Sequence, residues 1–337
     1  MNVCFEKLKL YLSLFYAPHP ICLDQDWKCP QAIGDSLLKD EDAHSPTECT
    51  NYITHIPLKF SHKRFFLIKA RQIIFFWKSN SPFLSSQSIS KQTNLKIFDL
   101  RRVKTWRIAR ARSIYIKSDL LEDFFALYGH LLSGKVIVSG GSDTNFNSIN
   151  NLPNDIKMLW LQNCSINNNE RIRTLPLGLE DLRLGRSGLK RYHFYNQSFE
   201  FSDKIFVPPM SPSNQIRREM IIKCKKNRAL YDVQLELLDE AKYFSLVKKY
   251  RFILCLEGNG HENHRIWETL YQGSFPVMQR TDWSTSLEYL DLPILYFSDI
   301  GDLNAGILSD FVAANMDFNP MNHESLWTPF WKSIFAS

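Results

Sequence analysis

Residues 251–280 read RFILCLEGNGHENHRIWETLYQGSFPVMQR, and this stretch decides the fold that the chain is expected to adopt. Phe252–Leu256 predicts a buried strand, and Glu257–Gly260 predicts a charged turn with two glycines. A short amphipathic helix follows and ends at Gly273, before Phe275–Met278 begins another strand. This order places backbone N–H groups and a helix N-terminus at the carboxyl edge of a parallel sheet, where α/β proteins bind phosphorylated ligands.

The composition is that of a globular protein of about two domains. The 337 residues are 44% hydrophobic and 23% charged, so each half is long enough to bury its own core. The net charge of +6 fits an acidic ligand, an anionic membrane surface or nucleic acid. Because 35 acidic residues are interspersed with the Lys and Arg along the chain, a dense basic stripe is not expected, and neither is a nucleic-acid partner.

The seven cysteines show no CxxC spacing, and Cys255 lies within an apolar run. We therefore expect reduced thiols in a cytoplasmic protein, with no metal site and no disulfide framework. Cys22, Cys29 and Cys49 leave a metal or a disulfide open as an alternative.

No segment reaches the 18 or so uncharged apolar residues that a membrane span requires, since charges interrupt the run Phe65–Trp77. Basic and aromatic residues are interleaved over 63–78, which is compatible with a peripheral membrane face. A buried helix with a basic edge is the alternative, because the apolar side chains are not segregated to one side. The sequence thus predicts a cytoplasmic protein and leaves peripheral membrane association open.

Strands and helices are expected to alternate from Lys96 onward, which predicts an α/β fold of two doubly wound, Rossmann-like domains facing across a cleft. The strands expected before residue 204 are Ser113–Lys117, Lys135–Ser139, Ile156–Leu161 and Ile172–Glu180, with a helix over Asp119–Leu132 that Asp119 caps. Those expected later are the strands Lys204–Pro208, Phe252–Leu256, Phe275–Met278 and Pro293–Phe297, with helices over Ser213–Lys226, Gln234–Tyr243 and Leu326–Phe335.

The expected domain boundaries follow from this alternation. Residues 1–95 are a poorly defined N-terminal region, broken by prolines. Residues 96–203 form an N-terminal domain, which takes in part of 1–95 as an alternative boundary, and 204–314 form a C-terminal domain. Residues 315–337 are a tail for which packing back on the N-terminal domain is one option.

Small and polar residues recur where the strands of the N-terminal half end. They are Gly140, Ser142, Asp143, Gln162, Asn163, Gly178 and Glu180. In an open parallel sheet such residues line one crevice, so we expect them to face a common cleft. Ordinary turn chemistry is the alternative for each residue taken singly.

The helix of the opening stretch is expected over about His261–Gln272. At about 100° per residue, one face carries His261, Arg265, Glu268 and Gln272, and the other carries Ile266, Trp267 and Leu270. Arg265 and the loop amides would bind a diphosphate, while Glu257 or Glu268 would accept hydrogen bonds from a ribose. The alternative is a surface ion pair between Arg265 and Glu268.

Three better-known motifs are excluded by their spacing. The pair of histidines in HENH does not match the zinc-protease pattern, and the loop lacks both the third glycine of a dinucleotide fingerprint and a Walker A lysine.

Residues Glu257–Val277 resemble the C-terminal signature of exostosin-like glycosyltransferases, approximately EGNGxDTHRxWEALxxGxIPV. A looser likeness covers roughly residues 110–300 and includes Trp160–Asn163, Leu175–Glu180 and Phe206–Asn214. The resemblance implies a GT-B fold, in which the C-terminal domain binds a nucleotide-diphosphate sugar and the N-terminal domain binds the acceptor. It also implies transfer of the sugar to a glycan or polysaccharide without a metal or other cofactor.

The resemblance carries a set of site residues onto this chain. The nucleotide-sugar-binding residues that it implies are Glu257, Gly258, Asn259, Gly260, His264, Arg265 and Glu268. The base that activates the acceptor hydroxyl is expected at Asp143 or Glu180, by position at a strand end, with a cap or loop role as the alternative.

The chain departs from the signature at one dipeptide. Glu262-Asn263 stands where the family has Asp-Thr. This departure motivates a second interpretation, a catalytically inactive carbohydrate-binding or scaffolding protein with the same fold.

Overall fold

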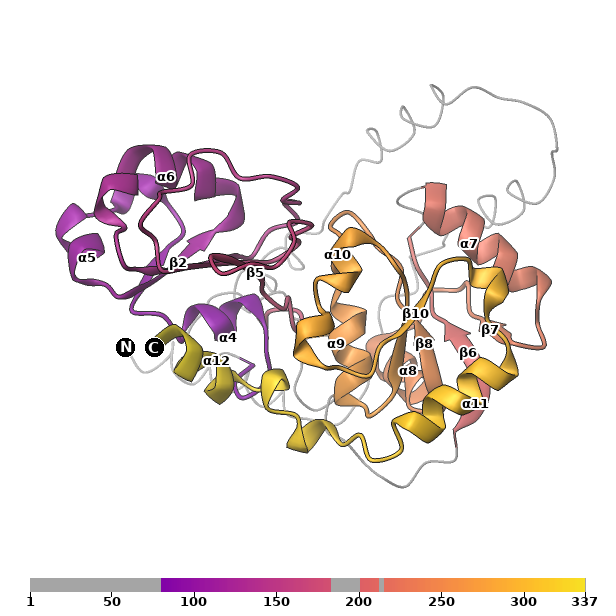
Figure 1. The fold of residues 1–337 in the computed structure, drawn as a ribbon. Coiled ribbons are helices and arrows are strands. Elements are labelled where there is room, and N and C mark those ends of the chain that lie inside the picture. Colours follow the sequence, from indigo (N-terminus) through magenta and orange to yellow (C-terminus); the bar gives the residue numbers. More distant parts are fainter. Residues whose placement is uncertain (1–79, 183–200, 212–214, 337) are drawn as a thin grey trace, which may run out of the picture. The chain divides into compact units, whose positions relative to one another are not determined.

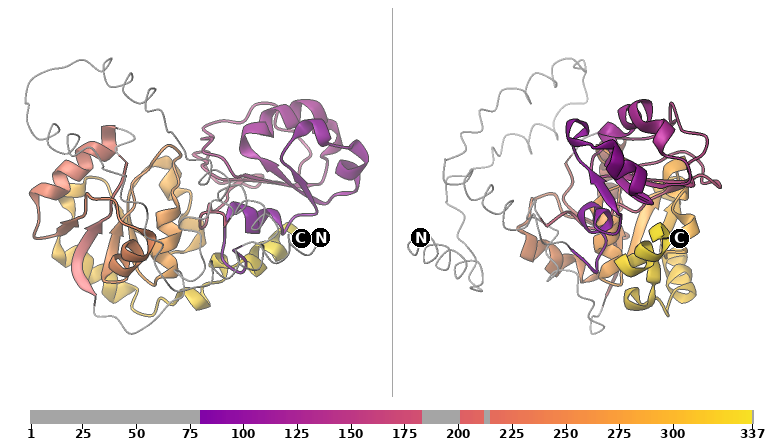
Figure 2. Two further views of the ribbon diagram at one scale, coloured as in Figure 1. Left: turned by 180° about the vertical axis from the view of Figure 1, so that it is seen from behind. Right: turned by 90° about the vertical axis from the view of Figure 1, so that its left-hand side faces the viewer.

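The structure is a computed structural model that describes residues 80–182, 201–211 and 215–336. All of these residues belong to one compact unit, His62–Ser337. They form a mixed α/β fold with two parallel sheets of five strands each (Figure 1, Figure 2). The predicted α/β class is therefore confirmed, and the architecture is compatible with two Rossmann-like domains.

The first sheet has the strand order β1-β2-β3-β4-β5, with every neighbouring pair parallel. Its strands are β1 Leu95–Ile97, β2 Ser113–Lys117, β3 Val136–Gly140, β4 Met158–Leu161 and β5 Ile172–Thr174. Among the described strands this order does not reverse, so the sheet lacks the switch point that defines a doubly wound topology. The doubly wound prediction is thus not met in this sheet.

Alternating side chains of the first sheet pack against different helices. Ile114 and Ile116 point to the face covered by α5 (Thr105–Arg110) and α6 (Leu121–Tyr128), where Ile108 and Phe124 are buried. Tyr115, Val138 and Trp160 point to the face covered by α4 (Ser86–Ser90) and α12 (Thr328–Ala336). Trp331 of α12 meets Trp160 edge to face, with ring centroids 5.4 Å apart. The C-terminal helix therefore packs on the first sheet.

The second sheet has the order β10-β9-β8-β6-β7 and is also parallel throughout. Its strands are β6 Ser202–Val207, β7 Tyr231–Val233, β8 Tyr250–Leu254, β9 Phe275–Gln279 and β10 Leu295–Phe297. Its helices are α7 Gln215–Lys226, α8 Glu240–Val247, α9 His264–Tyr271, α10 Asp282–Thr285 and α11 Ala305–Ala314. The strand order reverses between β6 and β8, so this sheet is doubly wound as predicted.

Three of the predicted elements that differ from the structure do so for a local reason. The helix expected over Asp119–Leu132 is divided, because only Leu121–Tyr128 is α-helical and 3₁₀ turns flank it. Asp119 does not cap it; its carboxylate pairs with Lys117. The strand expected over Ile172–Glu180 stops at Thr174, before Pro176 and the left-handed Gly178. The helix expected over Gln234–Tyr243 begins at Glu240, where Asp239 accepts a hydrogen bond from Lys242 N.

Gly178 provides a test of this architecture. Its φ is +74°, and a Cβ there would lie 2.4 Å from the backbone carbonyl of Leu84. Gly134 has a similar φ of +67° with no atom within 4 Å of a built Cβ, so it is a matched control. We expect Gly134→Ala to lower the free energy of unfolding by about 1–2 kcal/mol. Gly178→Ala should lower it by more than about 3 kcal/mol, because backbone must also move.

Denaturant unfolding of the two variants measures this difference directly. Equal losses of stability in the two variants would show that the close approach of Gly178 to Leu84 does not exist in solution.

Candidate functional site

The switch point of the second sheet brings together the chain segments that follow β6 and β8. Asn263 begins α9 at this point: its side chain accepts a hydrogen bond from Arg265 N at 3.1 Å and donates one to Leu256 O at 2.9 Å. The N-terminal end of α9 is thereby fixed beside the carboxyl end of β8. Such an end, with its exposed N–H groups and positive dipole, favours anions.

The predicted start of this helix is wrong by one turn. It begins at His264 because Asn263 is the N-cap, and His261 lies in the preceding loop. Ile266, Trp267 and Leu270 are buried, as the helical pattern predicts. Glu268 and Gln272 are buried as well, with 4% of each residue exposed. The polar face expected over four positions is therefore reduced to Arg265 at the start of the helix.

Arg265 is held by a tyrosine that was not among the predicted site residues. Its Nε donates to the Tyr243 hydroxyl at 3.3 Å and its Nη2 donates to Pro209 O at 3.3 Å. The same hydroxyl donates to Glu268 Oε2 at 3.1 Å. Burial raises the pKa of Tyr243, so the hydroxyl stays protonated at neutral pH. The hydroxyl of Tyr243 lies between Arg265 and Glu268, in place of the surface ion pair considered as the alternative.

Arg217 of α7 is a second guanidinium at this switch point. The side chain is buried, and it donates from Nη2 to Leu256 O at 2.8 Å and from Nη1 to Ser211 O at 3.0 Å. Gly258 packs against it, since a Cβ there would lie 3.1 Å from Nη2. Arg217 was not predicted as a site residue, because the sequence indicated only a helix over Ser213–Lys226. A signal was present, because Arg217, Met220 and Cys224 share the buried helical stripe.

The two arginines make the switch point electropositive. Burial, together with the charge of Arg265, lowers the pKa of Arg217 to about 10. Burial acts to lower the pKa of Arg265 too, but neighbours that include Tyr243 and Glu268 raise it, so both guanidinium groups are protonated at pH 7 and repel each other. An anion bound between them would relieve this repulsion. Charge-assisted hydrogen bonds from two guanidinium groups suit a diphosphate in particular.

Several groups of the glycine loop contact residues that follow the strands of the first sheet. The amides of His261 and Glu262 donate to Asn145 Oδ1 at 3.0 Å and to Asn163 Oδ1 at 2.8 Å. Gly260 packs on Asn163, whose Oδ1 would lie 3.0 Å from a Cβ at that glycine. Of the predicted loop residues, Asn259 is exposed. This loop is therefore a joint between the segments that carry the two sheets as well as a candidate ligand loop.

Two further predicted residues take part in the joint. His264 Nδ1 donates to Gly178 O at 2.8 Å, and Glu257 accepts from His261 Nδ1 at 2.9 Å and from Thr281 Oγ1 at 3.2 Å. Both side chains remain partly exposed. Their visible role is to hold the loop in place.

The polar residues at the strand ends of the first sheet gather as predicted but do not line an open cleft. Gln162 is fully buried, accepts from Gly141 N at 2.8 Å and donates to Pro176 O at 2.9 Å. Asn163 and Glu180 are also buried, at 1% and 5% exposed. Gly140 and Gly178 of the set are buried too, so these five residues do not face an open crevice.

The two candidate bases lie in different environments. Asp143 is exposed, in the turn that follows β3. Glu180 is buried, and its backbone carbonyl accepts from Asn80 Nδ2 at 2.9 Å. Of the two carboxylates, Asp143 is open to a hydroxyl in solution.

Glu262 is the buried carboxyl group of the joint. Its Oε1 accepts from Leu177 N at 2.8 Å and from Trp267 Nε1 at 2.7 Å, and Oε2 has no hydrogen-bond partner among the described residues. Burial raises the pKa of Glu262 to about 8, despite these two hydrogen bonds. The group is therefore mostly neutral at pH 7. A shorter aspartate, as in the resembled signature, would not span the same distance without movement of the loop.

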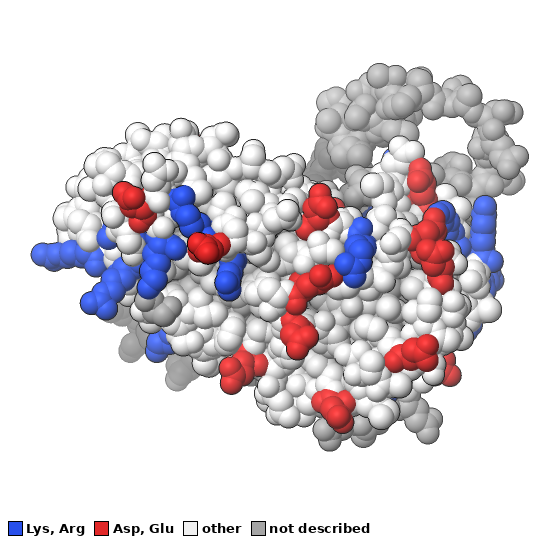
Figure 3. All heavy atoms as spheres, viewed as in Figure 1, with Lys and Arg blue, Asp and Glu red and all other residues white. Residues whose placement is uncertain are grey.

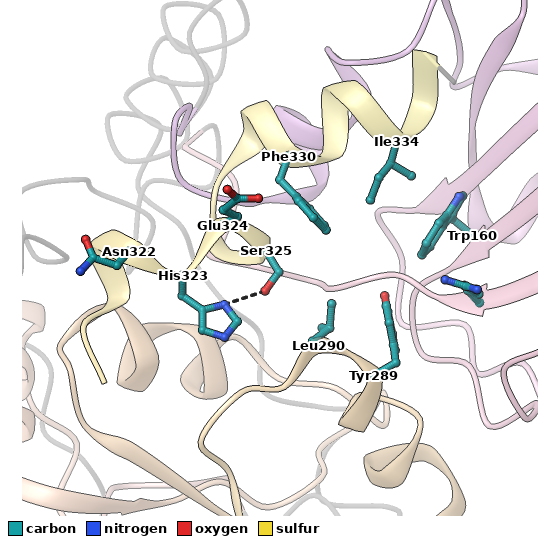
Figure 4. Close-up of a pocket in the computed structure, with 10 residues that line it drawn as sticks. Trp160, Tyr289, Leu290, Asn322, His323, Glu324, Ser325, Phe330 and Ile334 are labelled. Atoms are coloured by element: carbon teal, nitrogen blue, oxygen red, sulfur yellow. Dashed lines mark hydrogen bonds between the residues drawn. The ribbon is translucent and has the colours of Figure 1, made fainter. Parts of the chain in front are cut away.

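A separate cavity of about 420 Å³ lies beside the first sheet (Figure 4). Tyr289 and, from α12, Phe330 and Ile334 point into it, with Trp160 at one end. Its lining also includes Arg173, Leu290, Asn322, His323, Glu324 and Ser325. None of the predicted site residues lines it, so this cavity is distinct from the arginine pair.

The described residues cover only part of the predictions on cysteines, metal binding and membrane association. Cys164, Cys224 and Cys255 are free and buried, and burial raises the pKa of each thiol to about 11 or 12. Over residues 80–182, 201–211 and 215–336, no group of three His, Cys, Asp or Glu side chains is arranged to hold a metal. In the same ranges no helix combines the length and apolarity of a membrane span. Cys22, Cys29, Cys49 and the segment 63–78 lie outside the described residues.

Comparison with known proteins assigns no family. No protein-family model matches the chain, and no curated protein is significantly similar to it. Any assignment of function therefore rests on the geometry of the arginine pair and on the resemblance of Glu257–Val277.

The buried carboxyl group of Glu262 makes stability depend on pH. The unfolded chain releases this proton near pH 4.5, whereas the folded chain keeps it to about pH 8. Between these values the folded state binds more protons, so the free energy of unfolding falls as pH rises. The expected loss is on the order of 3 kcal/mol, and Glu262→Gln, which mimics the neutral acid, should remove it.

Chemical unfolding between pH 5 and pH 8.5 measures the effect. Glu236→Gln, at an exposed carboxylate, is the control and should keep the wild-type slope. A Glu262→Gln profile parallel to that of the wild type would mean that Glu262 is ionised in the folded protein.

Proposed function

We propose that this chain is a glycosyltransferase that moves a sugar from a nucleotide-diphosphate sugar to a hydroxyl of a glycan or polysaccharide. The observation that carries the proposal is the pair Arg217 and Arg265 at the switch point of the second sheet. Ligands of open α/β sheets bind outside the carboxyl ends of the strands at such a point. Residues Glu257–Val277, which resemble the glycosyltransferase signature, border the same switch point.

The arginine pair fits the chemistry of sugar transfer. The bond between the anomeric carbon and the diphosphate oxygen breaks, and negative charge develops on that oxygen. Guanidinium groups already held in place stabilise this charge without rearranging. Pro209 O and the Tyr243 hydroxyl fix the plane of Arg265, and Leu256 O and Ser211 O fix that of Arg217. In a metal-independent reaction these two side chains would take the place of a divalent cation.

The acceptor side of the proposal is a GT-B arrangement, in which the N-terminal half binds the acceptor across a cleft. The new bond forms between the acceptor oxygen and the anomeric carbon, and the hydroxyl proton passes to a base. Asp143 is the better placed of the two predicted bases, because it is exposed whereas Glu180 is buried. Glu180 is then the better candidate for a structural role.

The second candidate function, a catalytically inactive carbohydrate-binding or scaffolding protein, is supported by the joint. Glu262, which replaces the aspartate of the resembled signature, is used to anchor Leu177 and Trp267. His264 is likewise bonded to Gly178 O. Side chains that are hydrogen-bonded in this way stabilise the fold and leave fewer groups of the loop available to bind a ligand.

The arginine pair leads to a binding prediction. Arg217→Ala and Arg265→Ala should each weaken the binding of UDP or GDP by about 10- to 100-fold, because each removes a charge-assisted contact to phosphate. Binding of the corresponding monophosphates should change less. Arg218→Ala is the matched control, since Arg218 is the exposed neighbour of Arg217 on α7. Isothermal titration calorimetry of the full-length wild type and of each of the three variants measures these affinities for the diphosphates and the monophosphates.

Unchanged diphosphate affinity in both alanine variants would rule out this site. Transfer or hydrolysis of a panel of nucleotide sugars then separates the two candidate functions. Turnover that Asp143→Asn abolishes supports the transferase, whereas sugar binding without turnover supports the inactive protein.

A further inference from the structure

A cluster of cations lies on β1 and on the connection from β1 to β2. We call it the basic patch, and it consists of Lys96, Arg101, Arg102, Lys104, Arg107, Arg110 and Arg112, all exposed. Asp99 is the single carboxylate in the same stretch and pairs with Arg101 at 3.0 Å and Arg102 at 3.5 Å. The expectation that the chain carries no dense basic stripe is therefore wrong for this segment.

The fold forces these charges to face outward. Ile108 and Ala111 are buried and fix α5 against the first sheet. The helix is only six residues long, so Trp106, Arg107 and Arg110 project from its remaining surface. Figure 3 shows Lys and Arg gathered on the side of the molecule where Figure 1 places α5.

Stability alone does not account for the patch. Within the described part of the chain, no ion pair with a carboxylate is formed by Lys104, Arg107, Arg110 or Arg112. Like charges this close in sequence repel one another and disfavour the folded state. A negatively charged surface that neutralises them would remove this cost.

An exposed indole lies within the patch. Trp106 is 55% exposed, and the guanidinium carbon of Arg110 lies 5.3 Å from the centre of its ring. Phe98, at the end of β1, is also 55% exposed. Tryptophan beside basic side chains is the combination that settles at the boundary between lipid headgroups and acyl chains.

We propose that the basic patch docks this protein on anionic phospholipid headgroups, with Trp106 entering the interface. A bilayer offers a continuous negative surface, which suits cations that project from the outside of a helix. A single-stranded nucleic acid would call for a groove with aromatic rings placed to stack successive bases. The patch pairs one indole with its arginines, on an outer helix, and so favours the lipid surface. This surface is distinct from the segment 63–78 considered from the sequence.

Vesicle binding by the full-length protein tests the proposal. The wild type should co-sediment with phosphatidylcholine vesicles that contain phosphatidylserine, and not with phosphatidylcholine alone. Binding should weaken from about 0.1 M to about 0.5 M salt, because exposed charges are then screened over a shorter distance. Arg107→Glu with Arg110→Glu should weaken binding by at least about tenfold. Trp106→Ala should weaken chiefly the binding that persists at high salt.

The control carries the same change of charge elsewhere. Lys226→Glu with Arg228→Glu alters two exposed cations beyond the patch and should bind vesicles as the wild type does. All four positions are exposed, so unchanged melting temperatures should show that both variants fold. Equal binding by the two double variants, or no binding of the wild type to anionic vesicles, would overturn the proposal. Capture of a single-stranded oligonucleotide through the patch, without vesicle binding, would overturn it in favour of a nucleic-acid surface.

Discussion

The hydrogen bond from the amide of Glu262 to the side chain of Asn163, 2.8 Å long, is the contact on which the candidate site depends. Asn163 follows β4 of the first sheet in a left-handed conformation, with φ of +53°, and its Oδ1 also lies against Gly260. The glycine loop after β8 is thereby held from outside its own sheet. Because Asn263 then caps α9, the position of Arg265 is set by both sheets together.

The same joint explains why so many polar groups of this chain are buried. Gln162 and Asn163 have neighbours that satisfy most of their hydrogen-bonding capacity, as buried polar groups usually do, whereas in Glu262 only Oε1 is hydrogen-bonded within the described residues. The arginine pair is different, because it brings two like charges together: two backbone carbonyls hold Arg217, and Pro209 O and the Tyr243 hydroxyl hold Arg265. Proteins tolerate repulsion between like charges at binding sites, where a ligand of opposite charge neutralises it. The position of the arginine pair at the switch point distinguishes the candidate ligand site from the joint beside it.

Much of the fold could be predicted, because strands and loops are encoded locally. The run around Phe252 and the glycine after α9 each act within a few residues and were predicted. The cap at Asp239 is equally local, but it was not predicted, and the helix there was placed too early. The site could be predicted only in part. Arg265 was found from the helical pattern beside a glycine loop, whereas Arg217 was missed because it enters the site from another helix. Glu268 was expected to face a ligand, yet Tyr243 covers it.

The sequence by itself determined the order of strand, glycine loop and helix, and the charge of the residues placed along it. Periodicity and turn chemistry are short-range properties, so they can be read without knowledge of the fold. Only the tertiary structure decided which of those charges meet. The reversal of strand order between β6 and β8 brings α7 and α9 to one point, where burial and the charge of Arg265 lower the pKa of Arg217. Burial likewise made Glu262 a neutral anchor, because desolvation depends on neighbours that lie far away in the sequence.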